Sequence, residues 1–105
     1  MERLLEDAAE TFKLLSDKTR LTILALLKEQ ELCVCDIVAV LETTQPNVSQ
    51  HLKKLKNGGL VSETRRSQWI YYSLNVQDKP YVQGILEQLP SMKHRLNRLD
   101  PECCN

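Results

Sequence analysis

Two pairs of cysteines are the residues of this sequence best suited to chemistry. Cys33 and Cys35 are separated by one residue, and Cys103 and Cys104 are adjacent. In a chain without a secretion signal, closely spaced thiols of this kind are more typical of metal or redox chemistry than of a structural disulfide scaffold. Thiolates are also the ligands that soft ions prefer. The four cysteines are therefore candidate ligands for a thiophilic ion.

The first cysteine pair lies where a short helix over about residues 34–41 is expected to start. A thiolate at a helix N-terminus is stabilised by the helix dipole, so Cys33 and Cys35 together can chelate one ion. Cys103 and Cys104 belong to a tail over roughly residues 99–105 that we expect to be flexible. Adjacent cysteines there also suit a redox pair.

Helical periodicity covers most of the chain that surrounds these thiols. Apolar residues at helical spacing predict a helix over residues 2–15 and a second, central helix that Ser16 caps and that ends near residues 30–31. A further helix over about residues 45–57 has Thr44 as its cap and Pro46 in its first turn. Gly58 and Gly59 are expected to end this helix.

The pattern then changes to the alternation of β-strands. Residues 60–64 and 69–74 read as two strands, joined by a basic hairpin tip at residues 65–68. A last helix is expected from about residue 79 into the nineties, with a kink at Pro90. These elements predict a single domain over residues 1–105 that is mostly α with a β-hairpin wing (α+β), a winged helix-turn-helix.

In this layout the second helix of the helix-turn-helix pair enters the major groove of DNA. Asn and Gln side chains suit adenine edges, Ser suits either kind of base, and Lys suits phosphates. The outward residues of this helix and the wing arginines are therefore the candidate DNA contacts: Gln45, Asn47, Ser49, Gln50, Lys53, Lys54, Arg65 and Arg66. A solvated polar helix face is the simpler alternative, but it leaves the hairpin and its basic tip unexplained.

Charge and hydropathy narrow the class of protein. The net charge is zero, but residues 1–42 carry a balance of −4 and residues 43–75 a balance of +4, which gives a basic face to the DNA-binding half. No apolar run is long enough for a transmembrane helix, and no secretion signal is visible, so we expect a cytoplasmic protein that does not engage membranes. The sequence lacks Cys-x-x-Cys and a Gly-rich phosphate loop, which argues against an enzyme.

Four stretches of the chain resemble the ArsR/SmtB family of bacterial metal-responsive repressors. The stretches are Phe12–Leu21, Glu31–Asp36, Gln45–Leu52 and Trp69–Leu74. The resemblance implies a homodimer whose first and last helices form the interface. It also implies that double-stranded operator DNA is bound in the metal-free state.

The stretch Glu31–Asp36 resembles that of the family's arsenic sensors, which implies release by arsenite or antimonite. Those sensors usually carry a third cysteine three residues after the second, where this chain has Val38. We expect Cys103 or Cys104, from the same or the opposite subunit, to supply the third thiolate. A cadmium, lead or zinc sensor that uses the same cysteines, a thiol redox-sensing repressor, and a winged helix that binds protein instead of DNA remain alternatives.

Overall fold

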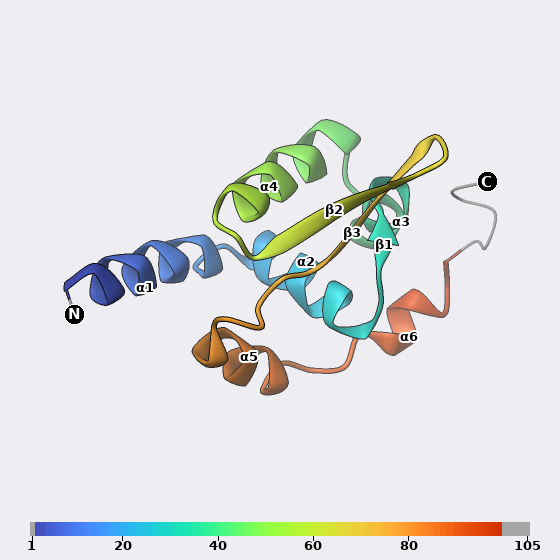
Figure 1. Ribbon diagram of the computed structural model, residues 1–105. Coiled ribbons are helices and arrows are strands. Elements are labelled where there is room, and N and C mark those ends of the chain that lie inside the picture. Colours follow the sequence, from blue (N-terminus) through green and yellow to red (C-terminus); the bar gives the residue numbers. More distant parts are fainter. Residues whose placement is uncertain (1, 100–105) are drawn as a thin grey trace.

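The computed structural model describes residues 2–99 (Figure 1). The described helices and strands, in chain order, are α1 (Glu2–Leu15), α2 (Lys18–Glu29), β1 (Leu32–Cys33), α3 (Val34–Leu41), α4 (Gln45–Asn57), β2 (Val61–Arg66), β3 (Trp69–Leu74), α5 (Pro80–Glu87) and α6 (Lys93–Leu96). The molecule is mostly helical, with an antiparallel hairpin between α4 and α5. The predicted winged helix-turn-helix is therefore confirmed.

The helix-turn-helix consists of α3 and α4, and local chemistry sets both ends of α4. The Thr44 side chain accepts a hydrogen bond from the backbone N–H of Asn47 at 3.3 Å, and a proline lies in the first turn. The helix ends at Asn57, and Gly59 follows with φ of +77°, a conformation that favours glycine. The predicted bounds of this helix are confirmed.

The hairpin β2–β3 forms the wing, and its register runs from Val61 opposite Leu74 to Arg66 opposite Trp69. β2 extends to Arg66, so the predicted tip at residues 65–68 was too wide. The strand β1 was not predicted, because two residues are too few to show a period. It pairs with the other edge of β3, with Cys33 opposite Tyr71, so the thiol segment and the wing share one sheet.

The core lies between α2, α3, α4 and the sheet. Ile23, Leu24 and Leu26 of α2 are fully buried, as expected for a central helix. Full burial also holds for the predicted stripe of α4, which is Val48, Leu52 and Leu55. Each such aliphatic side chain contributes about 1.5–3 kcal/mol when it leaves water. One face of α4 is thus fixed on the core, and the opposite face is left to solvent.

The predicted cap of the second helix was wrong. The cap of α2 is Asp17 and not Ser16, because the Asp17 carboxylate accepts a hydrogen bond from the backbone N–H of Arg20 at 3.0 Å. The Ser16 hydroxyl instead donates to the carbonyl of Lys13 at the end of α1.

The expected last helix is two separate helices, and not one helix with a kink. Pro90 cannot donate a backbone hydrogen bond, and α5 ends before it. Glu29 then accepts hydrogen bonds from the backbone N–H of Met92 at 2.8 Å and from the Ser91 hydroxyl at 3.0 Å. This carboxylate starts the short helix α6 against the end of α2.

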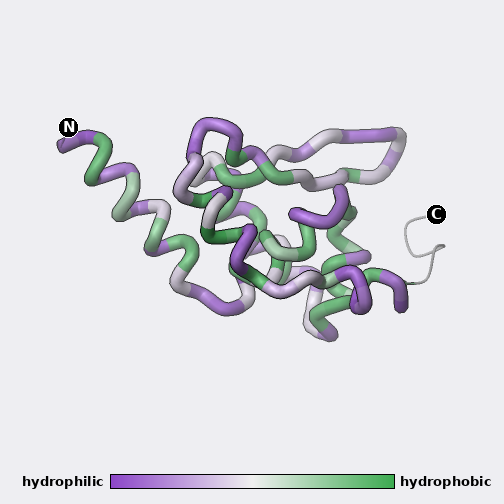
Figure 2. Tube along the Cα trace, turned by 90° about the horizontal axis from the view of Figure 1, so that it is seen from below, coloured by the Kyte–Doolittle hydropathy of each residue, from purple (hydrophilic) through white to green (hydrophobic). Residues whose placement is uncertain are grey.

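The helix α1 projects from the body as an arm (Figures 1 and 2). Leu4 and Leu5 are 72% and 70% exposed, and Phe12 is 47% exposed and contacts the ring of Tyr81 in α5, with centroids 5.7 Å apart. We call Leu4, Leu5, Phe12 and Tyr81 the α1 strip. None of the helices within residues 2–99 has the length and apolar character needed to cross a membrane.

Arg20 and Gly58 join the base of α1 to α4. The Arg20 guanidinium donates a hydrogen bond to the carbonyl of Leu14 at 2.7 Å and to His51 Nδ1 of α4 at 3.3 Å. A β-carbon on Gly58 would lie 2.2 Å from Leu14 Cδ1, so the absence of a side chain lets α1 approach the end of α4. The arm and the predicted reading helix are therefore in direct contact.

Candidate functional site

Cys33 stands at a junction of three elements. It is the last residue of β1, it caps α3, and its backbone pairs with β3 opposite Tyr71. Its backbone N–H also donates to Asp36 Oδ2 at 3.4 Å. Cys35 follows in the first turn of α3, so both thiols lie at a helix N-terminus as predicted.

The two sulfur atoms lie 2.7 Å apart, and Cys33 Sγ donates to Asp36 Oδ2 at 3.3 Å. One ligand atom from each of Cys33, Cys35 and Asp36 falls within 4.8 Å of the others. Sequence reasoning missed Asp36, although an acidic residue three positions after a helix cap is a familiar capping pattern. The cluster offers two soft sulfur ligands and one hard carboxylate oxygen, a set in which the sulfurs would hold a soft ion.

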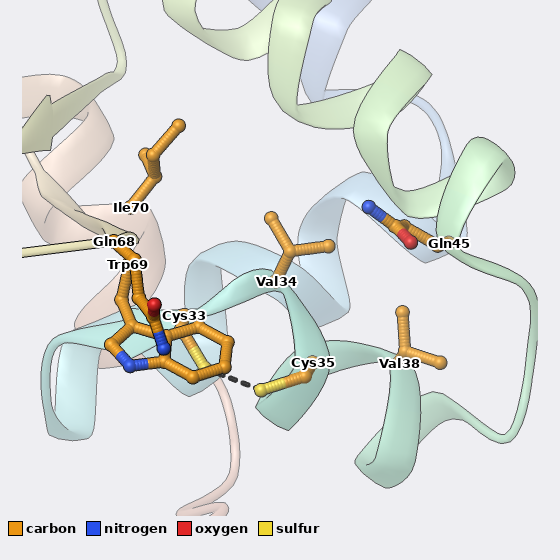
Figure 3. Close-up of a pocket in the computed structure, with 8 residues that line it drawn as sticks. All are labelled: Cys33, Val34, Cys35, Val38, Gln45, Gln68, Trp69 and Ile70. Carbon is orange, nitrogen blue, oxygen red and sulfur yellow. Dashed lines mark hydrogen bonds between the residues drawn. The ribbon is translucent and has the colours of Figure 1, made fainter. Parts of the chain in front are cut away.

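A pocket of about 410 Å³ opens beside the thiols (Figure 3). Cys33 is only 2% exposed, whereas Cys35 is half-buried, so an ion would enter past Cys35. The remaining lining residues come from α3, the first residue of α4 and the wing: Val34, Val38, Gln45, Gln68, Trp69 and Ile70. The thiols therefore share a cavity with both parts of the fold that are expected to touch DNA.

The candidate reading residues lie on the solvent side of α4, with one exception. Exposed positions are Gln45, Ser49, Gln50, Lys53 and Lys54. Asn47 is half-buried, and its side-chain amide donates to the Thr43 hydroxyl at 3.2 Å. A base contact by Asn47 would have to break or share this hydrogen bond.

The two wing arginines have different surroundings. Arg65 is exposed. Arg66 donates to both carboxylate oxygens of Glu31, with 3.0 Å between Nη2 and Oε2, and its guanidinium lies 5.2 Å from the centre of the Tyr71 ring. Since Glu31 directly precedes β1, Arg66 ties the wing to the segment that leads into Cys33.

An ion pair on the wing offsets part of the basic charge. Lys56 Nζ lies 2.5 Å from Glu63 Oε1, and Tyr72 donates to Glu63 Oε2 at 3.0 Å. The hydrogen bonds from Lys56 and Tyr72 lower the pKa of Glu63, while burial and the Glu63 contact raise the pKa of Tyr72 to about 12. Glu63 thus stays ionised and Tyr72 neutral at physiological pH.

The predicted ligands Cys103 and Cys104 lie outside the described residues.

Comparison with known proteins decides the family. A family model for bacterial regulatory proteins of the arsR family matches residues 17–63. The arsenical resistance operon repressor of Escherichia coli (strain K12) is 38% identical over 80 residues, which cover 75% of this chain and 68% of that protein. This chain belongs to the arsR family of bacterial regulatory proteins.

Other relatives are named for different metals or metalloids. The arsenic resistance transcriptional regulator ArsR1 of Pseudomonas putida is 39% identical, over 72% of this chain and 60% of that protein. A CadC homolog of Staphylococcus aureus, named as a cadmium resistance transcriptional regulatory protein, is 40% identical over 78% of this chain and 66% of that protein. Relatives named for arsenic and for cadmium are about equally similar to this chain, so these similarities do not select the ion.

Solved structures support the same assignment. HlyU from Vibrio cholerae has a TM-score of 0.75 and 32% identity, and the match covers 91% of this chain and 97% of that chain. A homodimeric winged helix-turn-helix DNA-binding domain from Mycobacterium bovis has a TM-score of 0.72 and 30% identity, over 82% of this chain and 80% of that chain. The prediction of a DNA-binding transcriptional repressor and not an enzyme is confirmed.

Proposed function

We propose that this arsR-family repressor binds its operator as a homodimer in the cytoplasm and is released when Cys33 and Cys35 take up arsenite or antimonite. The observation that carries the proposal is the pair of sulfur atoms 2.7 Å apart in a pocket that Gln45 of α4 also lines. Both oxyacids exchange hydroxyl groups for thiolates. An ion held by these sulfurs therefore acts at the start of the reading helix.

Operator binding would use the exposed face of α4 and the wing. Gln45, Ser49 and Gln50 present amide and hydroxyl groups suited to base edges, and Lys53 and Lys54 suit phosphates. Asn47 and Arg66 are candidate contacts that would first have to leave Thr43 and Glu31. A dimer places two such helices about 34–36 Å apart, one turn of DNA.

Two routes connect the thiols to these DNA contacts. The first is α3 itself, which packs on α4 and shares the pocket with Gln45. The second is β1, since Cys33 pairs with Tyr71 of the wing and Glu31 holds Arg66. If the ion favours a geometry in which the repressor binds DNA poorly, the bound ion lowers operator affinity. Bound DNA must then lower ion affinity by the same factor, about 5–150-fold for a typical coupling.

The third thiolate that arsenite takes is assigned to the tail as part of this proposal. The described residues gather two cysteines, and Val38 occupies the position where a third would be expected. Cys103 or Cys104, from the same or the partner subunit, would complete the set. Three-sulfur coordination that survives in a Cys103→Ser/Cys104→Ser double variant would contradict this assignment.

The test is an operator-release titration under reducing conditions with arsenite, antimonite, cadmium, lead and zinc. Wild type should release the operator at the lowest concentration with arsenite or antimonite. Cys33→Ser and Cys35→Ser should bind the operator as wild type does and lose the response, because either change breaks the sulfur pair that chelates the ion at the start of α3. Release at a lower concentration of cadmium, lead or zinc would show that the same cysteines sense that metal instead. The cadmium regulator among the relatives supports this alternative.

Thiol oxidation is a second candidate function, favoured by the contact between the two cysteine side chains. The two sulfur atoms contact each other at the start of α3, so they are placed to be oxidised together. One peroxide would oxidise the two thiols to a disulfide and be reduced to two waters, which take up both thiol protons. Operator release by peroxide without any ion, reversed by dithiothreitol, would support redox sensing.

A further inference from the structure

We propose that Arg20 and His51 are positioning residues for operator recognition, and that the hydrogen bond between them sets the half-site spacing that the dimer accepts. This inference rests on the proposed function, because it requires a homodimer, held through α1, that binds the operator. It does not involve the thiols. Arg20 joins the arm to the reading helix, and so it controls how the two α4 helices of a dimer are placed relative to each other.

The Arg20 side chain holds the end of α1 and the middle of α4 at the same time. Its Nε donates to the carbonyl of Leu14 at 2.7 Å, and its Nη2 donates to the carbonyl of Lys13 at 3.5 Å. A guanidinium has no acceptor, so His51 Nδ1 accepts the third hydrogen bond, from Nη1 at 3.3 Å. The backbone N–H of Arg20 is itself held by the Asp17 carboxylate at the start of α2. One side chain thus connects three helices.

Few other contacts fix the direction of the arm. In α1 only Thr11 and Leu15 are buried, and both lie in the half of the helix next to α2. Phe12 and Leu14 make apolar contacts with α5 and α4, and such contacts have no directional preference. Among the described residues, the hydrogen bonds between α1 and another helix all come from Arg20. The angle between the arm and the body therefore depends on this side chain.

A small change in this angle is large on the scale of DNA. The helix α1 has 14 residues, which makes it about 21 Å long. A tilt of about 10° at its base moves its far end by about 4 Å, close to the base-pair rise of about 3.4 Å. One added base pair also turns the next half-site by about 35° around the DNA axis. In a dimer held through α1, the arm angle thus determines which spacing both α4 helices can reach together (Figure 1).

His51 carries the restraint to the reading helix without belonging to its exposed face. It lies in the middle of α4, directly before the buried Leu52, and it is half-buried on the side that faces α2. The hydrogen bond from Arg20 therefore restrains α4 at a position outside the proposed DNA contacts. Loss of this bond should leave the exposed face of α4 able to bind a single half-site.

The test measures the preference for half-site spacing with reduced, ion-free protein. The probes are an operator selected in vitro with wild type, the same DNA with one base pair inserted or deleted at its centre, and a duplex with a single half-site. Wild type should bind the original spacing about tenfold or more tightly than either altered spacing. Arg20→Ala and His51→Ala should reduce this ratio to about threefold or less and keep wild-type affinity for the single half-site.

Two further variants separate positioning from general stability. His51→Asn can place an amide oxygen near the position of Nδ1, so it should retain the spacing preference. Lys28→Ala is the matched control for Arg20→Ala. Lys28 lies on the same helix and donates to the carbonyls of Leu86 and Leu89, at 3.2 and 3.4 Å, around the end of α5. Its hydrogen bonds do not join α1 to α4, so its loss should lower thermal stability and leave the spacing preference intact.

The outcomes distinguish the inference from the proposed function. A wild-type spacing ratio in Arg20→Ala or His51→Ala, or no spacing preference in wild type, would overturn the inference and leave ion sensing intact. Equal weakening on every DNA, the single half-site included, would show a merely structural role, and so would loss of the ratio in Lys28→Ala. Loss of the ratio in His51→Asn would show that the hydrogen bond is not responsible. If Arg20→Ala did not fold, the two His51 variants would decide the question. If wild type bound no operator, the proposed function itself would fail.

Discussion

At the scale of single residues, acidic side chains organise the starts of helices around the site. Asp36 accepts from the backbone and the thiol of Cys33, and Asp17 accepts from the backbone of Arg20. Asp36 therefore places the thiol that would bind the ion. Asp17 holds the helix from which Arg20 reaches α1 and His51.

Asp17 provides a prediction about pH. The backbone hydrogen bond from Arg20 lowers the pKa of Asp17 below its ordinary value of 3.8. Its contribution to folding is therefore fully present above that value and is lost as the pH falls through the lower folded pKa. Asp17→Asn keeps a cap without a charge, so its free energy of unfolding should fall less than that of wild type between about pH 5 and pH 3.

Urea unfolding at several pH values measures this difference. Asp17→Ala is the companion variant, and it should lose about 1 kcal/mol at neutral pH because the cap itself is gone. Equal acid sensitivity of wild type and Asp17→Asn would show that the Asp17 carboxylate does not titrate differently on folding.

At the scale of elements, the wing is both a proposed DNA-binding element and a neighbour of the thiols. β3 is the middle strand, with β1 and its Cys33 on one side and β2 with the two arginines on the other. Both arginines are exposed, but Arg66 is held by Glu31 and Tyr71. The two arginines should therefore have separable roles.

We expect Arg65→Ala to weaken operator binding and to reduce the slope of log affinity against log salt by about 1, because one phosphate contact is lost. Arg66→Ala should change the salt slope less and should reduce the effect of the inducer, because the link from Glu31 to the wing is broken. Fluorescence anisotropy with labelled operator at several salt concentrations, with and without arsenite, measures both effects. Equal salt slopes and equal induction in the two variants would contradict this division.

The same elements show what the sequence could predict. The helix over residues 45–57 was recognisable because its cap, proline, apolar stripe and terminal glycines all agree, and the structure has the same bounds. β1 has two residues and no period, so its pairing with β3 depends on tertiary contacts. The start of α6 after Pro90 depends on Glu29, which is distant in sequence. The thiol pair could be found in the sequence. The residues that line the pocket beside it could not, because α3 and the wing come together only in the folded chain.

At the scale of the whole molecule, the α1 strip is an exposed apolar surface, and we expect the proposed homodimer to form there. Leu4, Leu5 and Phe12 are exposed on an arm that leaves the body, and the similar domain from Mycobacterium bovis is homodimeric (Figure 2). Arg20 and the contact of Leu14 with Gly58 join this arm to α4. Dimerisation through α1 would thus fix the two reading helices relative to each other.

Leu5→Glu tests the dimer. A charge in the buried interface should shift the protein to the monomer and weaken operator binding at least tenfold, because each monomer then binds a half-site alone. Glu6→Ala is the matched control, since Glu6 is exposed on the same helix and does not belong to the α1 strip. Sedimentation equilibrium measures the mass. A Leu5→Glu protein that stays dimeric would place the interface elsewhere.

The central claim is that an ion on Cys33 and Cys35 lowers operator affinity. The most direct measurement titrates reduced protein, bound to fluorescently labelled operator, with arsenite while Trp69 emission and operator anisotropy are recorded in the same sample. The account predicts that both signals change together in wild type and that neither changes in Cys33→Ser or Cys35→Ser. Undiminished operator release in both serine variants would contradict it.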